Sequence, residues 1–102
     1  MNVDTGFVSP LVLAQVAVGA AQDLRDTDKA EAQKLLDKAE YEVERARELG
    51  YGGNDPEYAA LDKAISDLKA QLKGGGDTAS AFSALKDRVS AFFKRLSEGA
   101  RG

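Results

Sequence analysis

The chain has 102 residues, of which 43% are hydrophobic and 30% are charged, as in a globular domain. It holds neither cysteine nor histidine, which excludes disulfides, thiolate zinc sites, thiol nucleophiles and histidine bases. The formal net charge of -3 offers no basic face to nucleic acid. We therefore expect a single domain over residues 1–102, without a nucleic-acid partner.

The first predicted helix covers about residues 9–25 and is almost free of charged side chains. Ser9 followed by Pro10 indicates its start, because a serine caps well and a proline loses nothing at the first helical position. Gln15 and Gly19 interrupt an apolar run that is already marginal for crossing a bilayer, so we expect no membrane span. We interpret this segment as the most buried helix of a bundle. The side predicted to face the core carries Leu13, Val16 or Ala17, Ala20 and Leu24.

The second predicted helix covers about residues 28–49. Asp28 and Glu31 form an arrangement close to a capping box, which indicates the start of this helix. Gly50 indicates its end, because glycine readily adopts the left-handed backbone that closes helices. The apolar stripe of this helix is narrow and consists mostly of alanine. It comprises Ala32, Leu36, Ala39, Val43 and Ala46.

The third and fourth predicted helices cover about residues 56–73 and 77–97. An aspartate before a proline, Asp55 followed by Pro56, starts the third helix, and three glycines end it. Gly99 is expected to end the fourth helix. The apolar positions step by three and four residues in both. They are Leu61, Ile65, Leu68 and Leu72, then Phe82, Leu85, Val89, Phe92 and Leu96.

Short loops join these helices, so consecutive helices are expected to run antiparallel. The predicted fold class is all-α, an up-down-up-down four-helix bundle. The apolar positions of the second half also repeat those of the first, which indicates a duplicated helical hairpin.

The clearest hint of function is a run of carboxylates on the second helix. At 3.6 residues per turn, four acidic residues lie within an arc of about 80° around the helix axis. Like charges four residues apart repel, so a helix shaped only for stability would alternate its signs. Several carboxylate oxygens together suit a hard cation. The predicted metal ligands are Asp37, Glu40, Glu44 and Glu48.

One helix cannot surround an ion, so a neighbouring helix or a second chain would complete the ligand shell. The second case predicts metal-linked dimerisation. A competing interpretation is a solvated helix face, in which Glu44 pairs with Arg47 and Glu42 pairs with Arg45. A further alternative is a protein–protein interaction or scaffold module that binds no metal.

A second acidic cluster is expected at the opposite end of the bundle. It comprises Asp23, Asp26, Asp28 and Asp77. Two of these aspartates are expected to cap helices, which explains half of the cluster without a ligand. No nucleophile–base pair, phosphate loop or dinucleotide fingerprint is present, so we expect a protein that is not an enzyme and has no organic cofactor.

Four short helices, an acidic stripe and the absence of cysteine and histidine make residues 9–97 resemble the small bacterial metal-binding four-helix bundle proteins. In ligand chemistry the chain is most similar to the lanthanide-binding chaperones of methylotrophic bacteria. It departs from the histidine-rich members, so copper, nickel and zinc are not expected. The resemblance implies a non-catalytic protein that binds calcium or a lanthanide, can dimerise, and is periplasmic. The cytoplasm stays open as an alternative, because the basic start of a signal peptide is missing.

Overall fold

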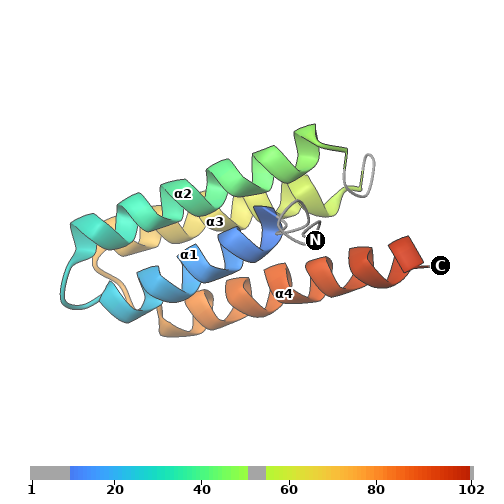
Figure 1. The fold of residues 1–102 in the computed structure, drawn as a ribbon. Helices are drawn as coiled ribbons and strands as arrows, with labels where there is room; N and C mark the ends of the chain where they lie inside the picture. The colour runs from blue at the N-terminus through green and yellow to red at the C-terminus, as the bar shows by residue number, and fades with distance from the viewer. Residues whose placement is uncertain (1–9, 51–54, 102) are drawn as a thin grey trace, which may run out of the picture.

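The computed structural model describes residues 10–50 and 55–101, and of residues 99–101 it describes the backbone only. Within these ranges the chain is all-α (Figure 1). The helices are α1 (Pro10–Leu24), α2 (Lys29–Glu48), α3 (Glu57–Gly74) and α4 (Ala79–Arg101).

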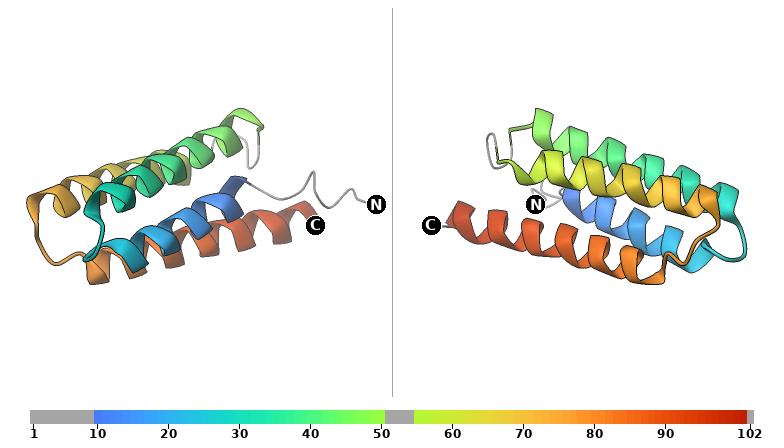
Figure 2. Two further views of the ribbon diagram at one scale, coloured as in Figure 1. Left: turned by 60° about the vertical axis from the view of Figure 1, so that its left-hand side comes forward. Right: turned by 180° about the vertical axis from the view of Figure 1, so that it is seen from behind.

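The helices form an up-down four-helix bundle, as predicted. Each helix packs against the one before it, and α1 also packs against α4, which closes the ring. Figure 1 and Figure 2 show the α1–α2 and α3–α4 connections at one end of the bundle. The packing contacts also place α2 beside α3, and α3 beside α4. The candidate sites lie in these two seams, α2–α3 and α3–α4.

The predicted aspartates accept backbone hydrogen bonds at the starts of the helices, although Pro56 and not Asp55 occupies the N-cap position of α3. The side chain of Asp28 accepts a hydrogen bond from the backbone N–H of Glu31 at 3.1 Å. Asp55 and Asp77 each accept one from the backbone N–H two residues further on, at 2.9 and 3.1 Å. These bonds satisfy backbone donors that a helix start leaves open. The predicted cap Ser9 lies outside the described residues.

The end of α4 differs from the prediction. Gly99 does not stop this helix, which continues to Arg101 instead of ending near residue 97. A glycine ends a helix when its backbone turns left-handed. Among the described residues only Gly50 and Gly75 have a positive φ, of 85° and 81°, and these two glycines follow the ends of α2 and α3.

The core contains the predicted apolar stripes of α2, α3 and α4 apart from the partly buried Leu96, whereas the predicted side of α1 is correct only for Ala17 and the partly buried Leu24. Val16 is 63% exposed, and Leu13 and Ala20 are only half-buried. The error has a physical cause, because α1 is apolar on most sides and its pattern therefore does not single out one face. The core-facing residues of α1 are Pro10, Leu11, Ala14, Ala17, Val18 and Ala21. No helix in the described ranges has the length and apolar character to cross a membrane.

Candidate functional site

A lysine of α3 pairs with the first two carboxylates of the predicted acidic stripe. The Nζ atom of Lys69 lies 2.7 Å from Asp37 Oδ1 and 3.1 Å from Glu40 Oε1, so it bridges two of the four predicted metal ligands. The other oxygen of Glu40 accepts a hydrogen bond from Ser66 Oγ at 3.2 Å. Both carboxylates raise the pKa of Lys69, with Asp37 the stronger cause. The ammonium is thus a resident counter-ion between α2 and α3.

The remaining two predicted ligands have different surroundings. Glu44 lies 3.5 Å from the guanidinium of Arg47, which is the pairing expected for a solvated face. Glu48 is exposed at the end of α2. Glu42 pairs with Lys38 at 3.4 Å instead of with Arg45, and only 3% of Glu42 is exposed.

Within residues 10–50 and 55–98, no three acidic side chains lie so that they could together hold a metal ion. Neither the stripe on α2 nor the second cluster forms such a site within these residues, and in the second cluster Asp28 and Asp77 accept hydrogen bonds from backbone N–H groups at helix starts. Arg25 lies 3.9 Å from Asp26 in that cluster. Cation binding by Asp37 and Glu40 would require their side chains to leave Lys69, and it stays a prediction.

Asp62, which no sequence pattern singled out, is the most unusual carboxyl group of the α2–α3 seam. Its Oδ1 atom is buried and has no hydrogen-bond partner. Burial and the neighbouring Glu44 raise the pKa of Asp62 to about 7, and Glu40 adds to the effect. A signal was present in the sequence, since Asp62 directly follows the core residue Leu61. The sequence did not indicate which residues of α2 would face it.

At the start of α3, ion pairs connect α3 to α4. Arg88 donates hydrogen bonds from Nε and Nη2 to the two carboxylate oxygens of Glu57, at 2.6 and 3.1 Å. Arg95 donates to Asp55 at 2.7 Å and lowers the pKa of that carboxyl group.

Buried aromatic rings pack beneath these ion pairs. Tyr58 and Phe92 meet edge to face, with ring centroids 5.0 Å apart. The guanidinium of Arg95 also lies over the Phe92 ring, 5.0 Å from its centroid. Aromatic and cation–π contacts of this kind add to the packing. The start of α3 is therefore firmly attached to α4.

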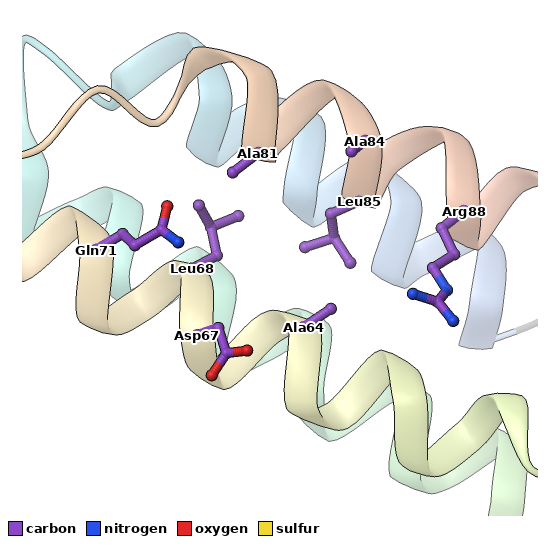
Figure 3. Close-up of a pocket in the computed structure, with 8 residues that line it drawn as sticks. All are labelled: Ala64, Asp67, Leu68, Gln71, Ala81, Ala84, Leu85 and Arg88. Carbon is purple, nitrogen blue, oxygen red and sulfur yellow. The ribbon is translucent and has the colours of Figure 1, made fainter.

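Further along, a groove opens between the same two helices. Figure 3 shows Leu68 and Leu85 directed into it from opposite sides, with Arg88 at one end. The floor is apolar and includes three alanines, so the backbones of α3 and α4 are accessible to a close neighbour. We call this feature the α3–α4 groove. It is lined by Ala64, Asp67, Leu68, Gln71, Ala81, Ala84, Leu85 and Arg88.

Comparisons with protein-family models, with curated proteins and with solved structures found no match to this chain. The candidate function therefore depends on the geometry of the described residues alone.

Proposed function

We propose that this protein is a non-enzymatic interaction module that binds an amphipathic helix of another protein in the α3–α4 groove. The observation that supports this proposal is an apolar groove on the surface of the bundle, between α3 and α4. An amphipathic helix binds such grooves by inserting apolar side chains spaced three and four residues apart.

The size of the groove favours a helix over a small molecule. Its volume is about 230 Å³. Pockets for cofactors and drug-sized ligands hold roughly 300–1,000 Å³ and enclose most of the ligand. Individual leucine- or valine-sized side chains of a partner need much less room. Small residues such as Ala64, Ala81 and Ala84 let the partner backbone approach closely.

The rim of the groove defines the chemistry of the partner helix. Asp67 stands on the α3 side, and Arg88 stands on the α4 side. Because Asp67 already pairs with Lys63 and Arg88 with Glu57, a matching helix exchanges these partners when it carries an apolar stripe with a lysine or arginine along one edge and an aspartate or glutamate along the other. Charges arranged this way give orientation and specificity more than affinity.

Binding of a hard cation such as calcium or a lanthanide is the second candidate function, and it rests on the charge of the α2–α3 seam. Asp37, Glu40, Glu44 and Asp62 bring four carboxyl groups to this seam. Lys69 already compensates two of them, and this arrangement favours the interaction module as the first candidate. A metal-linked homodimer and a periplasmic location belong to the cation proposal and stand or fall with it.

The proposed function can be tested with peptides. A phage library of helical peptides is selected on the full chain, and the affinity of enriched peptides is measured for two variants. Ala84→Glu places a charge in the groove, and Ala70→Glu makes the same change at an exposed position of α3 outside it. We expect Ala84→Glu to weaken binding more than tenfold, which is a change of about 1.4 kcal/mol, and Ala70→Glu to leave it unchanged.

Two results would contradict the proposal: a selection that enriches no peptide, or peptides that bind Ala84→Glu as tightly as the unmodified chain. Light scattering on the same samples shows whether a second copy of this chain fills the groove instead. In that case Ala84→Glu converts a dimer into a monomer, and Ala70→Glu does not.

A further inference from the structure

Within residues 10–50 and 55–98, the large hydrophobic side chains that stay exposed lie on one half of the bundle. They are Val16 on α1, Tyr41 on α2 and Leu49 directly after α2. A single exposed apolar residue is common, whereas a contiguous patch marks an interaction surface. Around Val16 the patch extends to the half-buried Leu13 and Ala20. Leu13, Val16 and Ala20, which we call the α1 stripe, have the three- and four-residue spacing with which one helix contacts another.

The α1 stripe lies on the flank of α1 that borders α2. Among the described helices, α1 packs against α2 and α4. Its flank toward α4 contains Gln22, which donates a hydrogen bond to Ser83 at 3.3 Å, and Gly19, which faces the side chain of Lys86. At 3.6 residues per turn, the α1 stripe occupies an arc of about 60° on the other flank of the helix. Its neighbour across the surface of the bundle is therefore α2.

The flank of α2 beside the α1 stripe is basic. Asp37 and Glu40 of α2 point the other way, toward α3, where they bind Lys69. Three basic residues lie within an arc of about 40° on the opposite flank of α2. Because α2 packs against α1 and α3, this flank adjoins α1. We call these residues the basic edge, and they are Lys34, Lys38 and Arg45.

The basic edge carries positive charge that the described part of the chain does not neutralise. Lys34 and Arg45 are exposed and form no ion pair with another described side chain. Lys38 pairs with Glu42 at 3.4 Å, but its side chain is 57% exposed, so its ammonium also faces water. An apolar stripe with a positive edge is complementary to a ligand that carries an apolar stripe with a negative edge.

We propose that the α1 stripe and the basic edge form a second docking surface, which binds an amphipathic helix with acidic residues along one edge. Such a helix inserts its apolar side chains over the α1 stripe and places its carboxylates against the basic edge. In the ring of four helices this surface lies across the bundle from the α3–α4 groove, and it does not depend on the groove. With both surfaces occupied, the protein connects two helical partners.

An anionic membrane and a second copy of this chain fit the surface less well. The net charge of -3 and the acids on the far flank of α2 repel an anionic lipid surface, which is broad. A helix about 10 Å wide avoids those acids, because it covers only the α1 stripe and the basic edge. A second copy would have to supply its own acidic stripe, in which Asp37 and Glu40 already pair with Lys69, and Glu44 pairs with Arg47.

The experiment selects a phage library of helical peptides on the Ala84→Glu chain, in which the α3–α4 groove carries a charge. We expect the enriched peptides to be amphipathic and acidic. Their affinity is then measured by fluorescence anisotropy for further variants in the same background. Val16→Glu should weaken binding by about tenfold or more, and Ala70→Glu, the matched change on α3, should leave it unchanged. Both positions are exposed, and melting temperatures check that the variants fold.

Lys34→Glu tests the basic edge separately. It should weaken peptide binding by about two- to fivefold at low ionic strength, as expected for an exposed ion pair, and the effect should shrink in 1 M salt. Lys73→Glu makes the same charge change at an exposed position near the end of α3 and should leave binding unchanged. An equal effect of the two variants would show that net charge, and not the basic edge, attracts the peptides.

The proposal is overturned if no peptide is enriched, or if the enriched peptides bind Val16→Glu as tightly as its parent chain. It is also overturned by binding to phosphatidylserine-containing vesicles in place of peptides, or by a dimer in light scattering that Val16→Glu converts into a monomer. These results would assign the surface to a membrane or to a second copy. Peptides of the α3–α4 groove lose affinity in Ala84→Glu and not in Val16→Glu, so the two proposals fail separately.

Discussion

Replacing Lys69 by methionine tests how the acidic stripe is neutralised. Methionine keeps much of the length and apolar character of the lysine stem but removes the ammonium that bridges Asp37 and Glu40. The Lys69 side chain is 26% exposed, so its two ion pairs are partly shielded from water. At about 0.5–1 kcal/mol for each pair and a few tenths for the repulsion left between the two acids, the expected loss is about 1–2 kcal/mol.

The assay is urea unfolding at neutral pH and low ionic strength. A loss of this size lowers the urea midpoint by about 1 M, given a slope near 1.5 kcal/mol per molar for a small domain. Lys63→Met is the matched control, because Lys63 binds one partner, Asp67, on an exposed face where its side chain is 78% exposed. Its expected loss is at most about 0.5 kcal/mol. Salt at 1 M, with a screening length of about 3 Å, should reduce the difference between the variants.

Equal urea midpoints for Lys69→Met and Lys63→Met would refute the reasoning, because they would mean that the bridge contributes no more than a surface pair. The same variant also tests the cation prediction. Without its ammonium, the pair Asp37 and Glu40 is open to another positive ion. If calcium or lanthanum restores the lost stability, these carboxylates can act as metal ligands. If neither ion does, the stripe is a set of helix-to-helix ion pairs.

Three further predictions concern other parts of the bundle. Phe92→Ala removes a buried ring from its edge-to-face contact with Tyr58, and calorimetry should show a loss of about 3–5 kcal/mol. Gly75→Ala should cost about 1–2 kcal/mol in urea unfolding because of its positive φ, whereas Gly74→Ala, in the last turn of α3, should not destabilise. Asp55 has a lowered pKa, so its contribution to stability is present above about pH 4 and is lost at lower pH. Asp55→Asn should therefore reduce the acid-induced fall in melting temperature.

The fold could be predicted because local signals agreed with one another. Asp28 and Asp55 each accept a backbone hydrogen bond at the start of a helix, and the apolar residues of α3 and α4 recur at helical spacing. The predictions were wrong where a sequence signal did not single out one helix face or one helix end. Val16 lies on a helix with apolar residues on most sides, and Gly99 is a glycine that keeps a helical backbone.

The surroundings of the acidic stripe could not be predicted, because they depend on the register between two helices. Lys69 is 29 residues from Glu40 in sequence, and only the packing of α3 on α2 brings them together. The same packing places Asp62 opposite Glu44. Charge periodicity within α2 identified which carboxylates share a face. It carried no information about the residues on the facing helix that neutralise some of them and repel others.

Glu42 and Lys38 form an ion pair, and replacing one partner or the other is expected to change the stability of the bundle differently. The Glu42 carboxylate is almost fully buried, one oxygen lies 3.4 Å from Lys38 Nζ, and the other has no hydrogen-bond partner. Replacing a buried ion pair by apolar residues of similar size is often neutral or stabilising by about 1–4 kcal/mol. The Lys38 side chain is 57% exposed and stays hydrated without its partner, so Glu42→Met should raise the urea midpoint or leave it unchanged. Lys38→Met instead leaves the buried carboxylate unpaired and should lower it.

The Lys38 ammonium is exposed, so water partly compensates for its loss, and about 1 kcal/mol is the expected size of that decrease. The double variant should be as stable as Glu42→Met alone, because the lysine has no further partner among the described side chains. A Glu42→Met protein that unfolds at clearly lower urea would show that the buried carboxylate stabilises the bundle. Its burial would then have to be explained by contacts other than the Lys38 pair.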